Sequence, residues 1–393
     1  MRKIIYIILI AFSILLLGCA DKTNNNKEVS FNDNENKNEY FETINKIKID
    51  INNADSTKIY SAIKLFEVND TSLFILDVYS SSLYMISNQG RIMKKIGGKG
   101  NGPGEFQFVS DFTLDNLKNI YVLDGLGGKV GKFDSTGKFI KNYFVSFTQR
   151  IPWKIQFFNN QFIISAEKNL SDGSTSANYD FLDYSDISYL NVYDNNFKYK
   201  FSFFHPVKKL ENTQGILNRE WDTFAPFTII KNSLIASQQD GFYALYLFNN
   251  NYKTIKEINV KTDSFKNINL NEVKGIKILS NKMPNISEEK IGKIIGNHSV
   301  PLKIFYDQPY LLIEVRNPLP NYFPEYAKDY NPTFHIDVFA FDNGELKPLI
   351  SNIANQGRLI GIGKNHCFYF EVQNSKNIYE NKYFFIYKKK LKL

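Results

Sequence analysis

The feature that most constrains the fold of this chain is an internal repeat with a constant offset of 47 residues. When residues 73–93 are aligned with residues 120–140, Asp77 falls on Asp124 and Gly90 falls on Gly137. Each copy contains an apolar strand, a polar turn and a second strand that leads into a glycine turn. A repeat of about 40–50 residues built from strands is typical of the four-stranded blades of a β-propeller.

Weaker copies of the repeat continue to the C-terminus. Each has one apolar strand that we assign as the second strand of a blade, and these strands start at Leu73, Ile120, Phe162, Leu234, Tyr310 and Cys367. The sequence therefore predicts an all-β protein, a six-bladed β-propeller over residues 45–393. Seven blades are the alternative, because residues 267–300 are unassigned. A ring of blades must also close, and the alternating strand at residues 47–51 is expected to pair with residues 383–387 of the last blade.

The N-terminus predicts export. Arg2 and Lys3 precede an apolar run that ends at Gly18 and Cys19, and this run is shorter than a membrane-spanning helix. Residues 16–19 resemble the lipobox of bacterial lipoproteins, in which the cysteine is acylated after cleavage. We expect a lipoprotein signal peptide over residues 1–18, lipidation of Cys19 and a disordered, polar tether over residues 19–44. A secreted protein cleaved near Ala20 is the alternative.

Charge and cysteine content limit the partners. The net charge of +8 falls to +6 once Arg2 and Lys3 are removed, and it is spread along the chain. We therefore expect no nucleic-acid partner, and the lysines at 388–390 are interpreted as a solvated terminus. Cys367 lies in an apolar strand and is expected to be a buried thiol. The expected product is a monomeric domain of an outer-membrane lipoprotein, facing either the periplasm or the cell surface.

One segment has a more specific signature. The residues from Gly97 to Phe106 read GGKGNGPGEF, and they are followed by the strand at 119–124 and by the turn Asp134 to Gly137. This pattern resembles the six-bladed β-propeller lipoproteins of Bacteroidetes, which are similar to NHL-repeat propellers. The resemblance is close over residues 73–144 and architectural beyond them. It implies a cell-envelope binding protein and no particular ligand.

The search for reaction chemistry is mostly negative. Gly98 to Gly104 leads into a strand rather than a helix, so we interpret it as a linker between blades and not as a phosphate loop. No serine lies in a nucleophile elbow. No pair of histidines has metal-ligand spacing, and His205, His298, His335 and His366 are each interpreted as a core or surface residue. We expect no catalytic residue, no metal and no cofactor. The alternative is a hydrolase or lactonase-like propeller enzyme with a metal on its axis.

The candidate binding surface follows from blade geometry. We name the four strands of a blade A to D from the axis outward. In an antiparallel blade, the B–C connections and the D–A connections to the next blade lie on one face, here called the B–C/D–A face. Long connections there, at residues 169–188 and 317–334, predict a rim that binds an unknown protein or carbohydrate ligand. The residues expected to contribute are Tyr79, Asn101, Glu105, Asp124, Tyr322, Phe323, Tyr326 and Tyr330. For the aromatic residues the alternative is a plug over their own blade, and for Asp124, as for Asp77, the alternative is a cap at the end of a strand.

Overall fold

A computed structural model gives the arrangement of most of the chain. It describes residues 40–50, 59–145, 152–166, 190–204, 225–237, 242–267, 269, 296–319, 333–342, 345–354, 356–373 and 383–393. The expected signal peptide and nearly all of the expected tether lie outside the described residues. The first strand begins at Phe41, four residues before the expected start of the propeller at residue 45.

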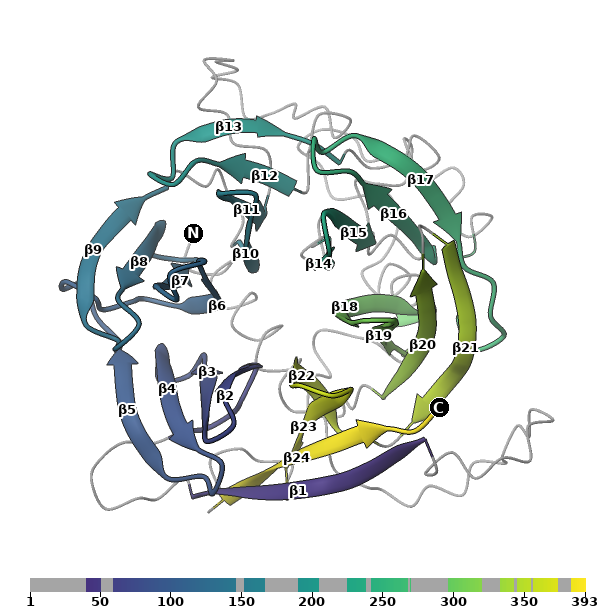
Figure 1. Ribbon diagram of the computed structural model, residues 1–393, viewed down its shortest axis with the longest axis horizontal. Coiled ribbons are helices and arrows are strands. Elements are labelled where there is room, and N and C mark those ends of the chain that lie inside the picture. Colours follow the sequence, from purple (N-terminus) through teal and green to yellow (C-terminus); the bar gives the residue numbers. More distant parts are fainter. Residues whose placement is uncertain are drawn as a thin grey trace, which may run out of the picture.

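The described strands form six four-stranded blades around a central axis, as predicted (Figure 1). Blade 1 contains β2 (Lys64–Asn69), β3 (Ser72–Asp77), β4 (Ser82–Ser87) and β5 (Ile92–Gly97); blade 2 contains β6 (Val109–Leu114), β7 (Ile120–Asp124), β8 (Lys129–Phe133) and β9 (Phe139–Phe144); blade 3 contains β10 (Lys154–Phe158), β11 (Gln161–Ser165), β12 (Leu190–Tyr193) and β13 (Tyr199–Ser202).

The second half of the ring has the same organisation. Blade 4 contains β14 (Phe227–Ile230), β15 (Ser233–Ser237), β16 (Ala244–Phe248) and β17 (Thr254–Asn259); blade 5 contains β18 (Val300–Asp307), β19 (Tyr310–Arg316), β20 (Phe334–Asp342) and β21 (Glu345–Ala354); blade 6 contains β22 (Arg358–Ile362), β23 (Cys367–Gln373), β24 (Tyr383–Leu391) and β1 (Phe41–Asp50). The six strands predicted as second strands are β3, β7, β11, β15, β19 and β23. The named elements of the described residues are all strands.

In the described part of the chain, one apolar cluster fills each of the six junctions between neighbouring blades. Strand β7 shows how they form. Ile120 and Val122 pack toward blade 1, whereas Tyr121 and Leu123 pack toward blade 3. Successive side chains of a strand point to opposite faces of its blade. A strand whose two faces pack against the blades on either side is therefore apolar throughout. The free thiol of Cys367 in β23 is buried, as expected, and burial raises its pKa.

The ring closes through its N-terminal strand, as predicted. Strand β1 pairs antiparallel with β24, and Ile47 and Ile49 lie opposite Ile386 and Phe384 (Figure 1). Both isoleucines are buried in the cluster between blades 6 and 1. The inner strands β2 and β22 also pair, in parallel, so that these two blades form one eight-stranded sheet.

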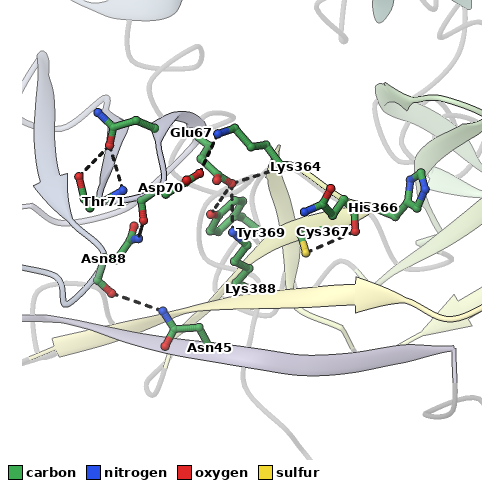
Figure 2. Close-up of polar contacts among 12 residues, drawn as sticks. Asn45, Glu67, Asp70, Thr71, Asn88, Lys364, His366, Cys367, Tyr369 and Lys388 are labelled. Carbon is green, nitrogen blue, oxygen red and sulfur yellow. Dashed lines mark hydrogen bonds and ion pairs between the residues drawn. The ribbon is translucent and has the colours of Figure 1, made fainter.

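A polar network reinforces this closure on the face opposite the B–C/D–A face (Figure 2). The Glu67 carboxylate of β2 accepts hydrogen bonds from the Tyr369 hydroxyl at 2.9 Å and from the Lys388 ammonium at 3.2 Å. Beside it, the Lys364 ammonium pairs with Asp70 at 2.7 Å. Each of these bonds joins blade 1 to blade 6. The side chains thus connect the same two blades that meet where the ring closes.

The lysines of β24 correct one expectation. Lys388 pairs with Glu67, and Lys389 donates to the Gln356 side chain at 2.9 Å and lies 5.1 Å from the Phe370 ring centre. Burial lowers the pKa of Lys389 to about 8. The interpretation as a solvated terminus was therefore wrong for these two residues. The reason is that β1 covers the outer edge of β24, so β24 lies inside the sheet.

Candidate functional site

The glycine-rich segment after β5 is a structural linker, as predicted. Its Phe106 is fully buried, and its ring lies 6.1 Å from that of Phe133 in blade 2. Gly97 has φ +78°, and a Cβ added there would come within 2.5 Å of the Phe106 ring. Glycine is required at this position both for the backbone conformation and for space. The segment therefore anchors the connection between blades 1 and 2.

Two of the predicted site residues lie on this linker and are exposed. The Asn101 side-chain oxygen accepts a hydrogen bond from the Gln107 side chain at 2.9 Å. The Glu105 carboxylate accepts one from the Gly102 backbone N–H at 2.9 Å. These contacts shape the loop and leave both side chains accessible on the B–C/D–A face.

Asp124, the third predicted residue, is fully buried. Its two carboxylate oxygens accept backbone N–H bonds from Gln107, Phe108 and Gly127, each at 2.9 Å. Asp77, its counterpart in blade 1, accepts from the Tyr60 and Tyr79 backbones at 3.2 and 3.1 Å. These aspartates hold the incoming linker against the end of the second strand, so Asp124 shapes the surface instead of touching a ligand.

The remaining predicted residues divide into two groups. Tyr79 is half-buried on the B–C turn of blade 1, where its ring packs 6.1 Å from that of Tyr60. The others lie outside the described residues, namely Cys19, Tyr322, Phe323, Tyr326 and Tyr330. The structure does describe the base of the fifth-blade loop, where Asn317 donates to the Thr333 hydroxyl at 3.0 Å and to its carbonyl at 2.9 Å.

Below this loop base lies a buried polar group that the sequence analysis missed. His335 and Asp337 of β20 are both buried, with the His335 Nε2 atom 3.6 Å from an Asp337 oxygen. The other ring nitrogen of His335 lies 2.5 Å from the Asn317 side-chain oxygen. Asp337 Oδ1 also accepts the Asn352 backbone N–H at 2.9 Å. His335 is thus a core histidine, as interpreted, but it connects the loop base to a buried carboxylate.

The second oxygen of Asp337 is not satisfied. It has no hydrogen-bond partner among the described residues, and neither has the buried hydroxyl of Tyr243, which precedes β16 in blade 4. Burial, then the negative charge of Asp337 and a side-chain interaction of the phenol with that carboxylate, raise the pKa of Tyr243 well above its ordinary value. The phenol is therefore within electrostatic reach of the carboxylate. Buried polar atoms without partners are rare in proteins, and they mark places where a ligand or water completes the bonding.

A cavity of about 620 Å³ lies at this carboxylate. It opens between the D–A connection that follows β17 and the outer strands β20 and β21 of blade 5, on the B–C/D–A face. The residues that line it combine hydroxyl, amide and carboxylate groups with aromatic rings, and they include Thr262, Ser264, Phe265, Asn267, Asp337, Phe339 and Asn352. The Phe265 ring stacks on Tyr243 at 4.5 Å. The volume is in the range of small-molecule sites.

One signal in the sequence could have indicated this site. His335 and Asp337 are two residues apart in an otherwise apolar strand, and this spacing places both side chains on one face. Among the described residues, no group of three or more histidine, cysteine, aspartate or glutamate side chains is arranged to hold a metal ion. The described residues also contain no helix long and apolar enough to cross a membrane.

Known structures share this architecture. A protein from Bacteroides fragilis NCTC 9343 that is described as exported aligns with a TM-score of 0.55 and 14% identity, over 90% of this chain and 96% of its own. A DUF4221-family member from Bacteroides vulgatus ATCC 8482 aligns with a TM-score of 0.60 and 15% identity, over 90% of this chain and 98% of its own. At these identities the alignments establish the fold alone.

The family of the chain follows from its sequence. No curated protein matches the chain. A family model described as "6-bladed beta-propeller" matches residues 19–315, a span that begins at the cysteine predicted to be lipidated and ends in the B strand of blade 5. The match covers most of the sequence and agrees with the ring of blades. The chain therefore belongs to this six-bladed β-propeller family, DUF5128.

Proposed function

We propose that this protein is a lipid-anchored binding module of the cell envelope that holds a ligand on its B–C/D–A face without catalysing a reaction. The observation that carries the proposal is the cavity of about 620 Å³ at which the buried Asp337 presents an oxygen without a partner. A carboxylate in such a position is costly to the fold unless something completes its hydrogen bonding.

The lining favours a carbohydrate over the alternative, a protein partner. Asp337 can accept a hydrogen bond from a sugar hydroxyl, while the Asn267 amide and the Ser264 hydroxyl can both donate and accept. The Phe265 and Phe339 rings supply apolar surface of the kind that packs on a sugar ring. This combination suits a neutral ligand rich in hydroxyl groups.

The aromatic loop of blade 5 is the second part of the proposed site. Tyr322, Phe323, Tyr326 and Tyr330 belong to the connection between β19 and β20, whose base is tied to His335 and thereby to Asp337. We propose that these rings extend the cavity as a platform for the ligand. The exposed side chains of Asn101 and Glu105 lie on the same face at the junction of blades 1 and 2.

The binding experiment uses the mature chain and a panel of immobilised oligosaccharides. In the Asp337→Asn variant, affinity for the captured sugar should fall at least about tenfold, since a hydrogen bond to a charged acceptor contributes about 1.5–3 kcal/mol. Tyr322→Ala should cost about 2 kcal/mol or more in binding, as truncated aromatic anchors do. The matched control is Asp70→Asn, the same chemical change at an exposed site on the opposite face.

The outcomes separate the alternatives. If Asp337→Asn binds as tightly as the wild type, the cavity is not the site. If no sugar binds and a protein partner co-purifies with the wild type from native membranes, the carbohydrate assignment is replaced by a protein one. If Tyr322→Ala lowers the melting temperature but leaves binding unchanged, the loop is a plug over blade 5 and not a platform.

The anchor is tested separately. The proposal that Cys19 is acylated rests on the residues at 16–19 and on the polar segment that follows them, and the description of the Bacteroides fragilis relative as exported agrees with it. Cys19→Ala should move the protein from the outer-membrane fraction to the soluble fraction. Retention of this variant in membranes after a high-salt wash would contradict the anchor.

A further inference from the structure

The inner strands carry a cluster of lysines that the proposed function does not use. The lysines border the propeller axis, here called the channel because the blades of a propeller surround a central channel. The innermost strands β2, β6, β10, β14, β18 and β22 surround the axis (Figure 1). Lys64 is the first residue of β2 and Lys154 the first of β10, and Lys303 lies in β18. These strands belong to blades 1, 3 and 5, so three alternate blades each contribute one cation to the channel.

Lys154 reaches across the channel. Its ammonium lies 5.3 Å from the ring centre of Phe227 in blade 4 and 5.9 Å from that of Phe305 in blade 5. Blade 5 is two blades away from β10, so the side chain must extend toward the axis. Each inner strand begins on the B–C/D–A face, where the connection from the preceding blade arrives. The channel therefore has Lys64 and Lys154 at its mouth on that face.

The three lysines differ in their partners. Lys64 donates to the Asp111 carboxylate and to the Phe112 carbonyl, both at 2.6 Å. Lys303 donates to the Leu359 carbonyl at 2.6 Å and lies 3.4 Å from the Glu314 carboxylate. No described residue gives Lys154 a hydrogen bond or an ion pair, and only the two aromatic rings contact its ammonium.

The nearby carboxylates compensate Lys154 only in part. Asp111 Oδ2 accepts the Ile155 backbone N–H at 2.9 Å, and Glu314 Oε1 accepts that of Leu359 at 2.7 Å. Glu314 Oε2 has no hydrogen-bond partner among the described residues and lies 3.4 Å from the Lys303 ammonium. Arg358 adds a fourth cation, 3.9 Å from Glu314. The third carboxylate, Glu371, is bonded to the Ser61 hydroxyl and to a backbone N–H, each at 3.0 Å.

The described channel residues therefore hold four cations against three carboxylates. Burial, and then the charges of Lys64 and Lys303, lower the pKa of Lys154 to about 7, although Asp111 opposes the shift. Burial likewise lowers the pKa of Lys303 to about 8, although the negative charge of Glu314 opposes the shift. An additional negative charge beside Lys154 would offset the energetic penalty that its partly buried charge imposes on the folded protein.

We propose that the channel mouth on the B–C/D–A face binds a small oxyanion, a carboxylate or a phosphate group, through Lys154 with Lys64 and Lys303 beside it. An ammonium has three donors, and an oxyanion supplies both the acceptors and the charge that Lys154 lacks. The rings of Phe227 and Phe305 lie beside this ammonium. This site lies on the axis, apart from the Asp337 cavity between blades 4 and 5.

The test measures anion binding to the mature full-length protein. Inorganic phosphate and succinate are titrated separately at constant ionic strength, with melting temperature and calorimetry as readouts. We expect a saturable rise in melting temperature with at least one anion, and at least about tenfold weaker binding in Lys154→Met. This variant should melt at the wild-type temperature or above it without the anion, because it removes a half-buried charge for which the described residues provide no ion pair. Lys141→Met, on the exposed outer strand β9, should bind as the wild type does.

The probes also identify the group and the residue. Saturation by phosphate alone assigns a phosphate site, and saturation by succinate alone assigns a carboxylate site. Succinate binding should weaken from about pH 7 to about pH 9 as Lys154 and then Lys303 lose their protons. The proposal is overturned if neither anion saturates, or if folded Lys154→Met binds as tightly as the wild type. Either result leaves the carbohydrate proposal at Asp337 unaffected.

Discussion

Two buried polar regions of this ring differ in how completely they are bonded. At the closure between blades 6 and 1, the Glu67 carboxylate has the Tyr369 hydroxyl and the Lys388 ammonium as partners (Figure 2). In the wall between blades 4 and 5, one Asp337 oxygen and the Tyr243 hydroxyl have no partner among the described residues. Both regions join neighbouring blades, and the second adjoins a cavity of about 620 Å³.

The difference separates groups that stabilise the fold from groups that are available to a ligand. A buried carboxylate surrounded by donors contributes to stability, and removing its donors leaves a costly charge. A buried carboxylate in which one oxygen lacks a hydrogen-bond partner already lowers the stability of the folded state. Mutations in the closure should therefore lower stability, while equivalent mutations at the cavity should lower binding.

Removing the closing strand should have the largest effect. A chain that starts after Asn52 loses β1 and with it the buried side chains of Phe41, Ile47 and Ile49. Each contributes about 1.5–3 kcal/mol through burial, so the loss of about 5 kcal/mol or more rivals the whole stability of a typical domain. Chemical denaturation should show a partly or fully unfolded protein. The control that lacks only residues 21–39 should melt like the wild type; equal stability of the two truncations would contradict closure by β1.

The pH dependence of stability extends the comparison to Asp77, a buried carboxyl group whose hydrogen-bond donors are all uncharged. Burial raises the pKa of Asp77 to about 7, despite hydrogen bonds from Ser80, Tyr60 and Tyr79. The folded state then holds a proton that the unfolded chain releases above about pH 4. The raised pKa of Asp77 adds to the free energy of unfolding. The added stability is complete below about pH 4 and is lost as the pH rises to about 7, a change of about 2–4 kcal/mol. Urea unfolding at about pH 5 and pH 7.5 measures it, and Asp77→Asn should lack this component. An equal pH slope in both proteins would contradict the assignment.

A matched pair of substitutions tests the comparison directly. Asp124→Asn turns an amide toward backbone donors that now lack an acceptor, and we expect it to lower the free energy of unfolding by about 2–3 kcal/mol. Asp337→Asn keeps an oxygen for Asn352 and should cost less than about 1 kcal/mol. Both aspartates are fully buried, so burial alone predicts equal effects. Similar losses of stability in urea unfolding would remove the distinction between the two regions.

The smallest expected effects concern single hydroxyl groups. Tyr369→Phe deletes the donor to Glu67 and should lower the free energy of unfolding by about 1–2 kcal/mol. Tyr243→Phe deletes a hydroxyl that has no close hydrogen-bond partner among the described residues, and it should stay within about 0.5 kcal/mol of the wild type. Thermal melts of the two variants give the comparison. A destabilised Tyr243→Phe would mean that its hydroxyl already has a partner in the folded protein.

Much of the fold could be predicted because the second strand of each blade is packed on both faces. Such strands are apolar throughout, and the offset between Asp77 and Asp124 marks two successive copies. The predicted start of the propeller at residue 45 was less accurate, because the first strand begins at Phe41. Strand β1 has a register shift between Thr43 and Asn45, which interrupts the alternation that identified residues 47–51, although Phe41 still packs 5.2 Å from Phe370.

The candidate sites could not be predicted in the same way. Tyr243 and Asp337 are brought together by neighbouring blades, and Lys64, Lys154 and Lys303 by alternate ones. A single sequence has no short-range spacing that reports such contacts. For Asp124 the sequence left two roles open, because a turn cap and a ligand-binding group have the same appearance in it. The structure shows the cap, with three backbone N–H groups bonded to the carboxylate.

The direction of the closing strand also determines which way the disc can face. Strand β1 runs antiparallel to β24, and its first residue pairs with Leu391 near the turn that joins β22 to β23. The chain therefore enters the ring on the side opposite the Asp337 cavity and the channel mouth. With the anchor proposed at Cys19, the attachment point of the propeller would be on the face opposite both proposed sites. Such an attachment would leave the B–C/D–A face free of the anchored strand.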